Sequence, residues 1–313
     1  MYTIIHPEAF INNLTVLQRE LSRLLPNIKL AFHEPMAKHT SFRIGGPVEV
    51  MAFPDNADQL AEILKVSALL DLKPAILGAG TNILAPDEGM QGLVICLKDG
   101  LSEITRLDQT HISVDAGVSM TRAAVYAAGA GLSGLEFAHG IPGSVGGGVY
   151  MNAGAYGGEI KDVCIFVDVM SMDGQIHTYR SEQMDFSYRH SRLEDEGGIV
   201  IRAVFALLPK RCEEIKDRMQ ELAAKRKASQ PLDKPSAGSA FKRPVGGYAA
   251  ALIDSAGLKG YQVGGAAISE KHAGFAVNLG GATAQDVQNL LQHVSDIVFE
   301  KSGIRLEPEV RIW

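Results

Sequence analysis

The chain has 313 residues, 46% of them hydrophobic and 21% charged, with a formal net charge of −6. This composition excludes a disordered chain, and the basic residues are scattered rather than gathered into the stripe of a nucleic-acid-binding protein. No basic flank precedes an apolar core at the N-terminus, and no apolar run approaches the roughly 18 residues of a membrane span. We therefore expect a cytoplasmic globular protein with no nucleic-acid partner.

The first two hundred residues alternate between helical and strand-like patterns. Apolar residues at helical spacing predict an amphipathic helix from Phe10 to Leu25. Between about 48 and 97, short β-rich runs alternate with one helical pattern, "ADQLAEILKVSALL". From 101 to 208 strands dominate, interrupted by a predicted helix, "SMTRAAVYAAGAG", and by a glycine-rich stretch. These patterns predict two α/β subdomains, over residues 1–100 and 101–208.

The composition changes after residue 208, where a charged helix over 211–227 leads into a third unit, residues 209–313. This unit contains "GGYAAALIDSAGL", a strand-rich middle, the helix "TAQDVQNLLQHVSDIVFEKSG" and a closing strand, "IRLEPEVRIW". Strand alternation would put Glu307, Glu309 and Arg311 on one face. We expect an α+β protein in which two glycine-bearing subdomains hold a cofactor and the third unit covers it.

Cysteine and histidine spacing gives no indication of a metal site. Cys96, Cys164 and Cys212 lie far apart without a CxxC pair, as buried cytosolic thiols would. The nine histidines form neither HxH nor HExxH. We therefore predict that the protein holds no metal.

The first glycine signal is "AILGAGTNIL", residues 75–84, where an apolar run breaks into glycines. Successive backbone N–H groups at such a strand end can form a concave nest for a diphosphate. A Rossmann site would need a third glycine and a following helix, and a Walker loop would need Lys-Ser or Lys-Thr; the sequence has neither. An ordinary tight turn is the alternative for this segment alone.

The second signal is "GIPGSVGGGVYMNAGAYGGE", with eight glycines between Gly140 and Glu159. Glycine within an element costs roughly 0.5–1 kcal/mol relative to alanine, so this density indicates close approach to the main chain. Two loops, "IPGSVGG" and "NAGAYGG", predict a long flat ligand with a diphosphate in its middle. A flavin dinucleotide has this shape.

Three polar segments are candidates for chemistry. In "KPSAGSAFKRP", Ser239 could donate a proton or act as a nucleophile, although the GxSxG pattern of a serine hydrolase is missing and helix capping is the simpler role. In "SYRHSRL", Arg189 could clamp a carboxylate, or it could be solvated. In "RLEPEVRIW", the glutamates could instead form a surface ion-pair ladder.

Six segments in order are "HTSFRIGGP", "LGAGTNIL", "GLEFAHGIPGSVGGGVYMNAGAYGGE", "YRHSRL", "AGSAFKRP" and "LEPEVRI". Together they resemble the bacterial flavoenzyme family of UDP-N-acetylenolpyruvoylglucosamine reductase, also called UDP-N-acetylmuramate dehydrogenase. The resemblance implies an FAD-binding module of the vanillyl-alcohol-oxidase type, built from two α/β subdomains, followed by a C-terminal α+β substrate domain. It also implies an oxidoreductase of peptidoglycan precursor synthesis, which serves cell-wall biogenesis, cell shape and division.

The family's glycine loops hold non-covalent FAD. In this sequence they correspond to Gly78, Ala79, Gly80, Thr81, Asn82, Ile141, Pro142, Gly143, Ser144, Gly146, Gly147, Asn152, Gly154, Ala155 and Gly157. The reaction that the resemblance implies takes a hydride from NADPH to the flavin and then to C3 of the enolpyruvyl group of UDP-N-acetylglucosamine enolpyruvate.

The family's catalytic arginine, serine and glutamate correspond to Arg189, Ser239 and Glu309, with Glu307 as the alternative glutamate. Arg189 would bind the substrate carboxylate, Ser239 would protonate C2, and Glu309 would orient Arg189 or assist proton transfer. The substrate diphosphate would need cations, and those nearest Ser239 in sequence include Lys227, Lys242 and Arg243.

Two features depart from the general family pattern. Some members have asparagine where this chain has Arg243, and the 50 residues from Arg189 to Ser239 (239 − 189) are too few for the tyrosine loop of the longer form. The chain therefore resembles the short form. Two rival functions remain: an oxidase of the same flavin superfamily, with the flavin tethered to His39 or His139, and a non-catalytic nucleotide-binding protein.

Overall fold

The computed structural model describes residues 14–313, so Phe10 and Ile11 of the first predicted helix lie outside the described residues. Helix α2 spans Val16–Leu24. The Thr15 hydroxyl accepts a hydrogen bond from the Gln18 N–H, and the Gln18 side chain accepts one from the Thr15 N–H. This capping box fixes the start of α2 at Thr15.

The first subdomain is a four-stranded sheet in the order β1-β2-β5-β3. Its elements are β1 (Lys29–Pro35), β2 (Pro47–Phe53), α3 (Ala57–Leu69), β3 (Ala75–Leu77), β4 (Ile83–Leu84) and β5 (Met90–Cys96). Strand β1 runs antiparallel to β2, whereas β2, β5 and β3 are parallel. Leu60, Ile63 and Leu64 of α3 pack with Leu21 of α2 in the core of this sheet. The α/β pattern predicted for residues 48–97 is confirmed.

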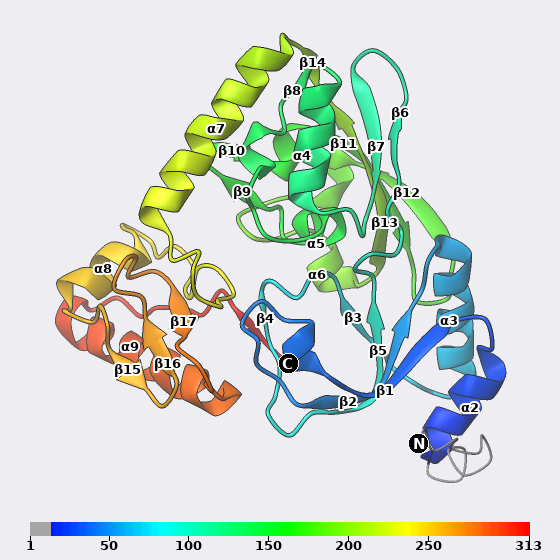
Figure 1. Ribbon diagram of the computed structural model, residues 1–313, viewed down its shortest axis with the longest axis horizontal. Helices are drawn as coiled ribbons and strands as arrows, with labels where there is room; N and C mark the ends of the chain where they lie inside the picture. The colour runs from blue at the N-terminus through cyan, green and yellow to red at the C-terminus, as the bar shows by residue number, and fades with distance from the viewer. Residues whose placement is uncertain (1–13) are drawn as a thin grey trace, which may run out of the picture.

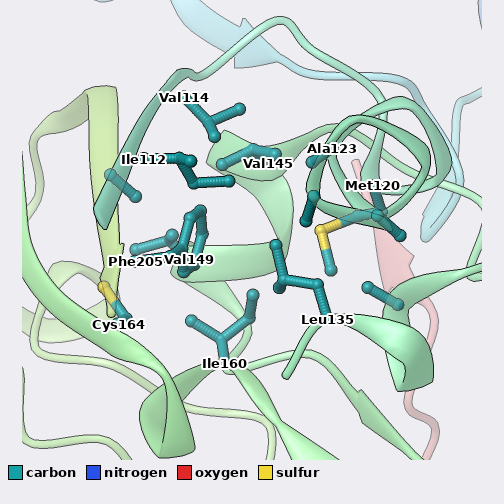
Figure 2. Close-up of a cluster of buried hydrophobic side chains, with 14 of the residues drawn as sticks. Ile112, Val114, Met120, Ala123, Leu135, Val145, Val149, Ile160, Cys164 and Phe205 are labelled. Atoms are coloured by element: carbon teal, nitrogen blue, oxygen red, sulfur yellow. The ribbon is translucent and has the colours of Figure 1, made fainter. Parts of the chain in front are cut away.

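The second subdomain is a five-stranded antiparallel sheet in the order β12-β11-β13-β7-β6. Its strands are β6 (Ile104–Arg106), β7 (His111–Asp115), β11 (Cys164–Met170), β12 (Ile176–Arg180) and β13 (Ile199–Ala206). Its other elements are α4 (Met120–Gly129), β8 (Leu132–Ser133), α5 (Val145–Tyr150), β9 (Gly154–Ala155), β10 (Gly158–Glu159), α6 (Leu193–Glu196) and β14 (Leu208–Pro209). Figure 2 shows Val145 and Val149 of α5 among core side chains from β7 and β13.

The C-terminal unit packs two helices with a three-stranded antiparallel sheet (Figure 1). Its elements are α8 (Ala249–Ser255), β15 (Gln262–Val263), β16 (Ala266–Ile268), β17 (Ala276–Asn278) and α9 (Ala284–Ser302). Helix α7 (Cys212–Ser229) precedes it, and Ile215 and Met219 of α7 are buried in the core of the second subdomain. The expected start of the C-terminal unit at residue 209 therefore assigns to that unit a helix, α7, that packs on the second subdomain.

The predicted closing strand is much shorter than expected. Only Arg311–Ile312 form a strand, β18, which pairs in parallel with β4 of the first subdomain. The segment before it contacts the C-terminal unit through an isolated bridge between Phe241 and Pro308. Figure 1 shows the end of the chain beside β4, away from the helices of its own unit. The last residues therefore join the C-terminal unit to the first subdomain.

All three cysteines are free thiols, and Cys96 and Cys164 are buried. Burial raises the pKa of the Cys164 thiol to about 12. No helix within residues 14–313 is long and apolar enough to cross a membrane.

Candidate active site

A cavity of about 1040 Å³ is walled by residues from both α/β subdomains and from the C-terminal unit. Ligand pockets of proteins usually measure about 300–1,000 Å³, so the volume of this cavity is slightly above that range. It has room for a dinucleotide and lies where the three units meet.

The first glycine loop, residues 78–82, lines the cavity along its whole length. Gly80 has φ of +64°, and a Cβ there would lie 1.9 Å from the carbonyl oxygen of His39, so only glycine fits. The Thr81 hydroxyl donates to the Pro142 carbonyl at 3.1 Å. The Asn82 side chain donates to the Glu309 carbonyl at 3.1 Å. This loop therefore contacts both the second glycine segment and the catalytic candidate Glu309.

The second glycine segment also lines the cavity, with Ile141, Pro142, Gly143, Ser144, Gly146 and Gly147 in its wall. The sequence predicts a loop over "IPGSVGG", whereas the structure has a loop only as far as Ser144 and then helix α5. Ser144 caps this helix by accepting a hydrogen bond from the Gly147 N–H at 3.3 Å. Because a Cβ at residue 146 would lie 2.8 Å from the Ala116 Cβ, close packing within the protein requires glycine there.

Only part of the third glycine segment, residues 152–157, lines the cavity. Gly154 and Ala155, in β9, line the cavity, but Asn152 and Gly157 do not. Asn152 is fully buried, and its side chain donates to the Glu159 carboxylate at 2.8 Å and to the Ser187 carbonyl at 2.9 Å. Its φ of +42° is a left-handed conformation that asparagine tolerates. The structure therefore places Asn152 as a support of the loop rather than in the cavity wall.

The three catalytic candidates, Arg189, Ser239 and Glu309, all line the cavity. Arg189 Nε donates to Glu309 Oε1 at 2.7 Å, and both side chains are mostly buried, with exposed fractions of 24% and 9%. Arg189 sits in a tight turn closed by backbone hydrogen bonds between Ser187 and His190, with φ of +56°. Such a conformation is strained for a long side chain and is often found at functional sites.

Tyr188 contacts the other oxygen of the same carboxylate. Its hydroxyl lies 3.3 Å from Glu309 Oε2 and accepts a hydrogen bond from the Arg243 N–H at 3.2 Å. Burial, together with the neighbouring Glu309 charge, raises the pKa of Tyr188. Tyr188 therefore stays protonated and able to donate to Glu309.

Ser239 is held on a short ladder of backbone contacts. It forms an isolated bridge with Phe275, and the next residue, Ala240, accepts a hydrogen bond from the Glu309 N–H at 2.9 Å. This pairing brings Ser239 close to Glu309, which is far away in sequence. The alternative glutamate, Glu307, has a side chain 74% exposed and lies 3.5 Å from Lys242 Nζ, outside the cavity wall.

The cations chosen for the substrate diphosphate lie elsewhere. Lys227, Lys242 and Arg243 are exposed and do not line the cavity, and the Arg243 guanidinium lies 4.8 Å from the centre of the Tyr248 ring. The cavity is instead lined by other cations, including Arg43, Arg226 and Lys234. Side chains of adjacent residues in a helix point about 100° apart. The side chain of Lys227 therefore faces solvent, whereas that of the preceding residue, Arg226, is buried.

Arg226 could have been found in the sequence. Ile215, Met219, Leu222 and Arg226 are the buried residues of α7 and recur at helical spacing, so this arginine occupies the apolar stripe of the helix. A charge in such a stripe needs a partner, which makes it a candidate for ligand binding.

Several observations fit a flavin dinucleotide in this cavity. The wall carries glycine backbone at both of the first two segments, as a diphosphate nest requires. Buried donor atoms of Arg226 and Arg311, both in the wall, have no hydrogen-bond partner in the described structure. Neither His39 nor His139, the candidates for a covalent tether, lines the cavity. Residues 14–313 contain no group of three potential metal ligands.

Comparison with known families agrees with this site. A family model described as "FAD binding domain" matches residues 48–180, and one described as "UDP-N-acetylenolpyruvoylglucosamine reductase, C-terminal domain" matches residues 230–313. A UDP-N-acetylenolpyruvoylglucosamine reductase of Agathobacter rectalis is 48% identical over 305 residues, which cover 94% of this chain and 97% of the relative. The chain belongs to the UDP-N-acetylenolpyruvoylglucosamine reductase family.

Further relatives support this assignment. The reductase of Caldanaerobacter subterraneus is 46% identical over 95% of this chain and 98% of its own length. The crystal structure of the enzyme from Thermus caldophilus superposes with a TM-score of 0.77 at 38% identity, covering 92% of this chain and 99% of that one. The family resemblance, the FAD-binding fold and the C-terminal domain expected from the sequence are confirmed, and the chain has the length of the short form.

Proposed function

We propose that this chain reduces UDP-N-acetylglucosamine enolpyruvate to UDP-N-acetylmuramate with NADPH, in peptidoglycan precursor synthesis. The observation that carries the proposal is the convergence of Arg189, Ser239 and Glu309 on one cavity whose wall includes the glycine segments. The glycine segments of the cavity wall would hold FAD, which would supply hydride transfer between NADPH and C3 of the enolpyruvyl group.

Arg189 binds the carboxylate of the enolpyruvyl group in this proposal. Its Nε is held by Glu309, and its two Nη atoms have no hydrogen bond to any residue between 14 and 313. An edge of the guanidinium is therefore free to hold a carboxylate by paired hydrogen bonds. Hydride addition at C3 places negative charge on the carboxylate end of the substrate, and a fixed cation there stabilises the transition state.

Ser239 delivers the proton to C2. A serine hydroxyl is a weak acid in water, so this role needs neighbours that stabilise its charge while the proton moves. The nearby pair of Arg189 and Glu309, connected to Ser239 through the Ala240 backbone, can supply the polar surroundings. Lys242, which the sequence suggested as a cation for the substrate diphosphate, faces Glu307 outside the cavity.

The test follows the visible absorption of the purified protein without oxygen. We expect flavin bands that bleach on addition of NADPH and return on addition of the enolpyruvyl nucleotide sugar. Ser239→Ala should still bleach with NADPH, but recovery with the sugar should slow by roughly 100-fold or more. Ser229→Ala, on the exposed face of α7, is the matched control.

Three outcomes would contradict the proposal. Absence of flavin bands after reconstitution with FAD would remove the cofactor assignment. Bands that return only with oxygen would indicate an oxidase. Normal recovery in Ser239→Ala would show that another group supplies the proton.

A further inference from the structure

Two exposed cations, Arg43 and Lys234, line the cavity, and the proposed reaction steps use neither of them. The Arg43 guanidinium forms no hydrogen bond or ion pair with any residue from 14 to 313. Its backbone has φ of +56°, a left-handed conformation that is uncommon for a long side chain. Strain of this kind is concentrated at functional sites, which makes Arg43 a candidate for ligand binding.

Backbone contacts bring the two cations to the same part of the cavity wall. The Ser41 hydroxyl donates to the Ser236 carbonyl at 2.7 Å, so residue 41 lies against residue 236. Asn278 connects the next positions, because its side chain donates to the carbonyl of residue 42 at 3.0 Å and its N–H donates to the carbonyl of residue 235 at 2.9 Å. The following positions of the two segments are Arg43 and Lys234. Both side chains are exposed, so this pair lies at the solvent-facing edge of the cavity.

The charge around the Arg43–Lys234 pair is positive. Lys234 Nζ lies 3.4 Å from Asp233 Oδ2, but the Asp233 side chain is 72% exposed, and an ion pair of this kind is weak. A backbone hydrogen bond, together with the charges of Lys234 and Lys271, lowers the pKa of the Asp233 carboxyl. Three cations therefore surround one carboxylate, and this edge of the cavity attracts anions.

The nucleotides of the proposed reaction differ in the charge that they carry at their far ends. Hydride transfer brings the reacting end of each ligand to the mostly buried Arg189 and Glu309, so the opposite end of NADPH or of the nucleotide sugar extends towards solvent. The sugar ends in an uncharged uridine. NADPH ends in an adenosine whose ribose carries a 2′-phosphate of about −1.5 to −2 charge at pH 7. Arginine commonly accommodates this phosphate in dinucleotide-binding proteins.

We infer, on the basis of the proposed function, that Arg43 and Lys234 bind the 2′-phosphate of NADPH and make the chain select NADPH over NADH. The guanidinium can hold two phosphate oxygens through parallel N–H groups, and the ammonium adds a second positive charge. The nicotinamide that gives up the hydride is identical in NADPH and NADH. The pair therefore controls the affinity for the nucleotide and leaves the rate of the hydride step at saturation unchanged.

The experiment follows the bleaching of the flavin in the FAD-loaded protein without oxygen, over a range of NADPH or NADH concentrations. The variants are Arg43→Asn, Lys234→Gln and their combination. Asparagine tolerates a left-handed φ, so Arg43→Asn removes the charge without adding strain. We expect the double variant to need roughly tenfold more NADPH for half-maximal rate, whereas the value for NADH stays within twofold.

Two controls separate recognition of the phosphate from general effects of charge. Lys216→Gln removes an exposed cation of α7 outside the cavity wall and should leave the NADPH preference unchanged. Arg43→Lys keeps the charge and should retain more of the preference than Arg43→Asn. Raising the salt concentration from about 0.05 M to about 0.5 M screens exposed charges, so it should reduce the preference of wild type and have little effect on the double variant.

Four results would overturn the inference. The first two are a double variant that keeps the NADPH preference of wild type and a wild type that shows no such preference. Equal weakening for NADPH and NADH would assign the pair to a part that both nucleotides share, such as the diphosphate. A raised KM for the nucleotide sugar with unchanged use of NADPH would assign it to the sugar. If neither NADPH nor NADH bleached the flavin of wild type, the proposed function would be contradicted instead.

Discussion

Arg189 Nε lies 2.7 Å from Glu309 Oε1, although 120 positions separate the two residues in the chain. The pair joins a strained turn of the second subdomain to a segment that pairs with the first, so it forms only when all three units are assembled. The carboxylate uses one oxygen for Arg189 and offers the other to Tyr188, which fixes the direction of the guanidinium.

Replacing Glu309 by glutamine should impair the reaction far more than binding of the cofactor. Glu309→Gln removes the charge that holds Arg189, and we expect kcat to fall by roughly 100-fold or more, with FAD affinity within a few-fold of wild type. Steady-state kinetics and flavin fluorescence titration measure the two quantities. Glu307→Gln is the control, since its exposed side chain lies outside the cavity wall, and it should stay within twofold of wild type. A larger loss of kcat in Glu307→Gln than in Glu309→Gln would identify Glu307 as the functional glutamate.

Adding a methyl group at Gly146 should destabilise the second subdomain. The new Cβ would lie 2.8 Å from the Ala116 Cβ, and overpacking of this kind costs about 1–3 kcal/mol. Gly129→Ala adds the same group at the exposed end of α4, where a Cβ meets nothing within 4 Å, and should be neutral or stabilising. Urea unfolding of the two variants without added FAD gives the comparison. Equal stabilities would show that α5 can move away from Ala116 without cost.

The sequence could predict elements with strong local patterns and could not predict contacts that override them. Helix α9 was found because its apolar periodicity agrees with its capping residue Thr283, and helix α7 was found because its charged sequence is typical of a helix. Helix α5 was expected to be a loop because three consecutive glycines are poor helix formers; the helix forms because glycines let it approach Ala116 and Met120 closely.

The candidate site likewise combines residues that sequence motifs could predict with contacts that they could not. Motif resemblance identified Arg189, Ser239 and Glu309, all of which line the cavity. It did not separate Glu309 from Glu307, because the structure abandons strand alternation at this segment and bridges Phe241 to Pro308 instead. Lys227 was proposed as a diphosphate-binding cation because it is near Ser239 in sequence. The adjacent Arg226 is the residue that lines the cavity, because its position around helix α7 makes its side chain face inward.

Asp87 should stabilise the junction between the first subdomain and the C-terminal unit. Its carboxylate accepts hydrogen bonds from the N–H groups of Ala284 at 2.8 Å and Gln285 at 3.2 Å, in the first turn of α9. Asp87→Ala removes these two hydrogen bonds and the interaction of the carboxylate with the helix dipole, and we expect a loss of about 1 kcal/mol in urea unfolding. Asp217→Ala, on the exposed face of α7, should change stability by less than half as much. A smaller loss for Asp87→Ala than for this control would contradict the role.

His272 should make the folded protein less stable in mild acid. Burial lowers the pKa of its imidazole, and its Nδ1 accepts a hydrogen bond from the Gly274 N–H at 3.1 Å, which requires the neutral ring. Because the folded-state pKa is below the unfolded value of about 6.5, this stabilisation is present above that pH. It is lost as the pH falls through the folded-state pKa.

Unfolding free energies of wild type and His272→Gln, measured between pH 8 and pH 5, provide the test. The stability difference between wild type and variant should shrink as the pH falls. A difference that is constant across this range would show that His272 does not gain a proton on unfolding.

The pairing of β18 with β4 has a consequence for biosynthesis. Glu309 precedes β18 in the chain, whereas Asn82, which binds the Glu309 carbonyl, lies in the first subdomain. During translation, N-terminal segments emerge and fold first. The glycine segments can therefore form on the ribosome, but the cavity gains its last wall only after the segment up to Trp313 has emerged. The catalytic candidates are consequently brought together only after this segment has been synthesised, and a nascent chain without it would still lack the Arg189–Glu309 pair.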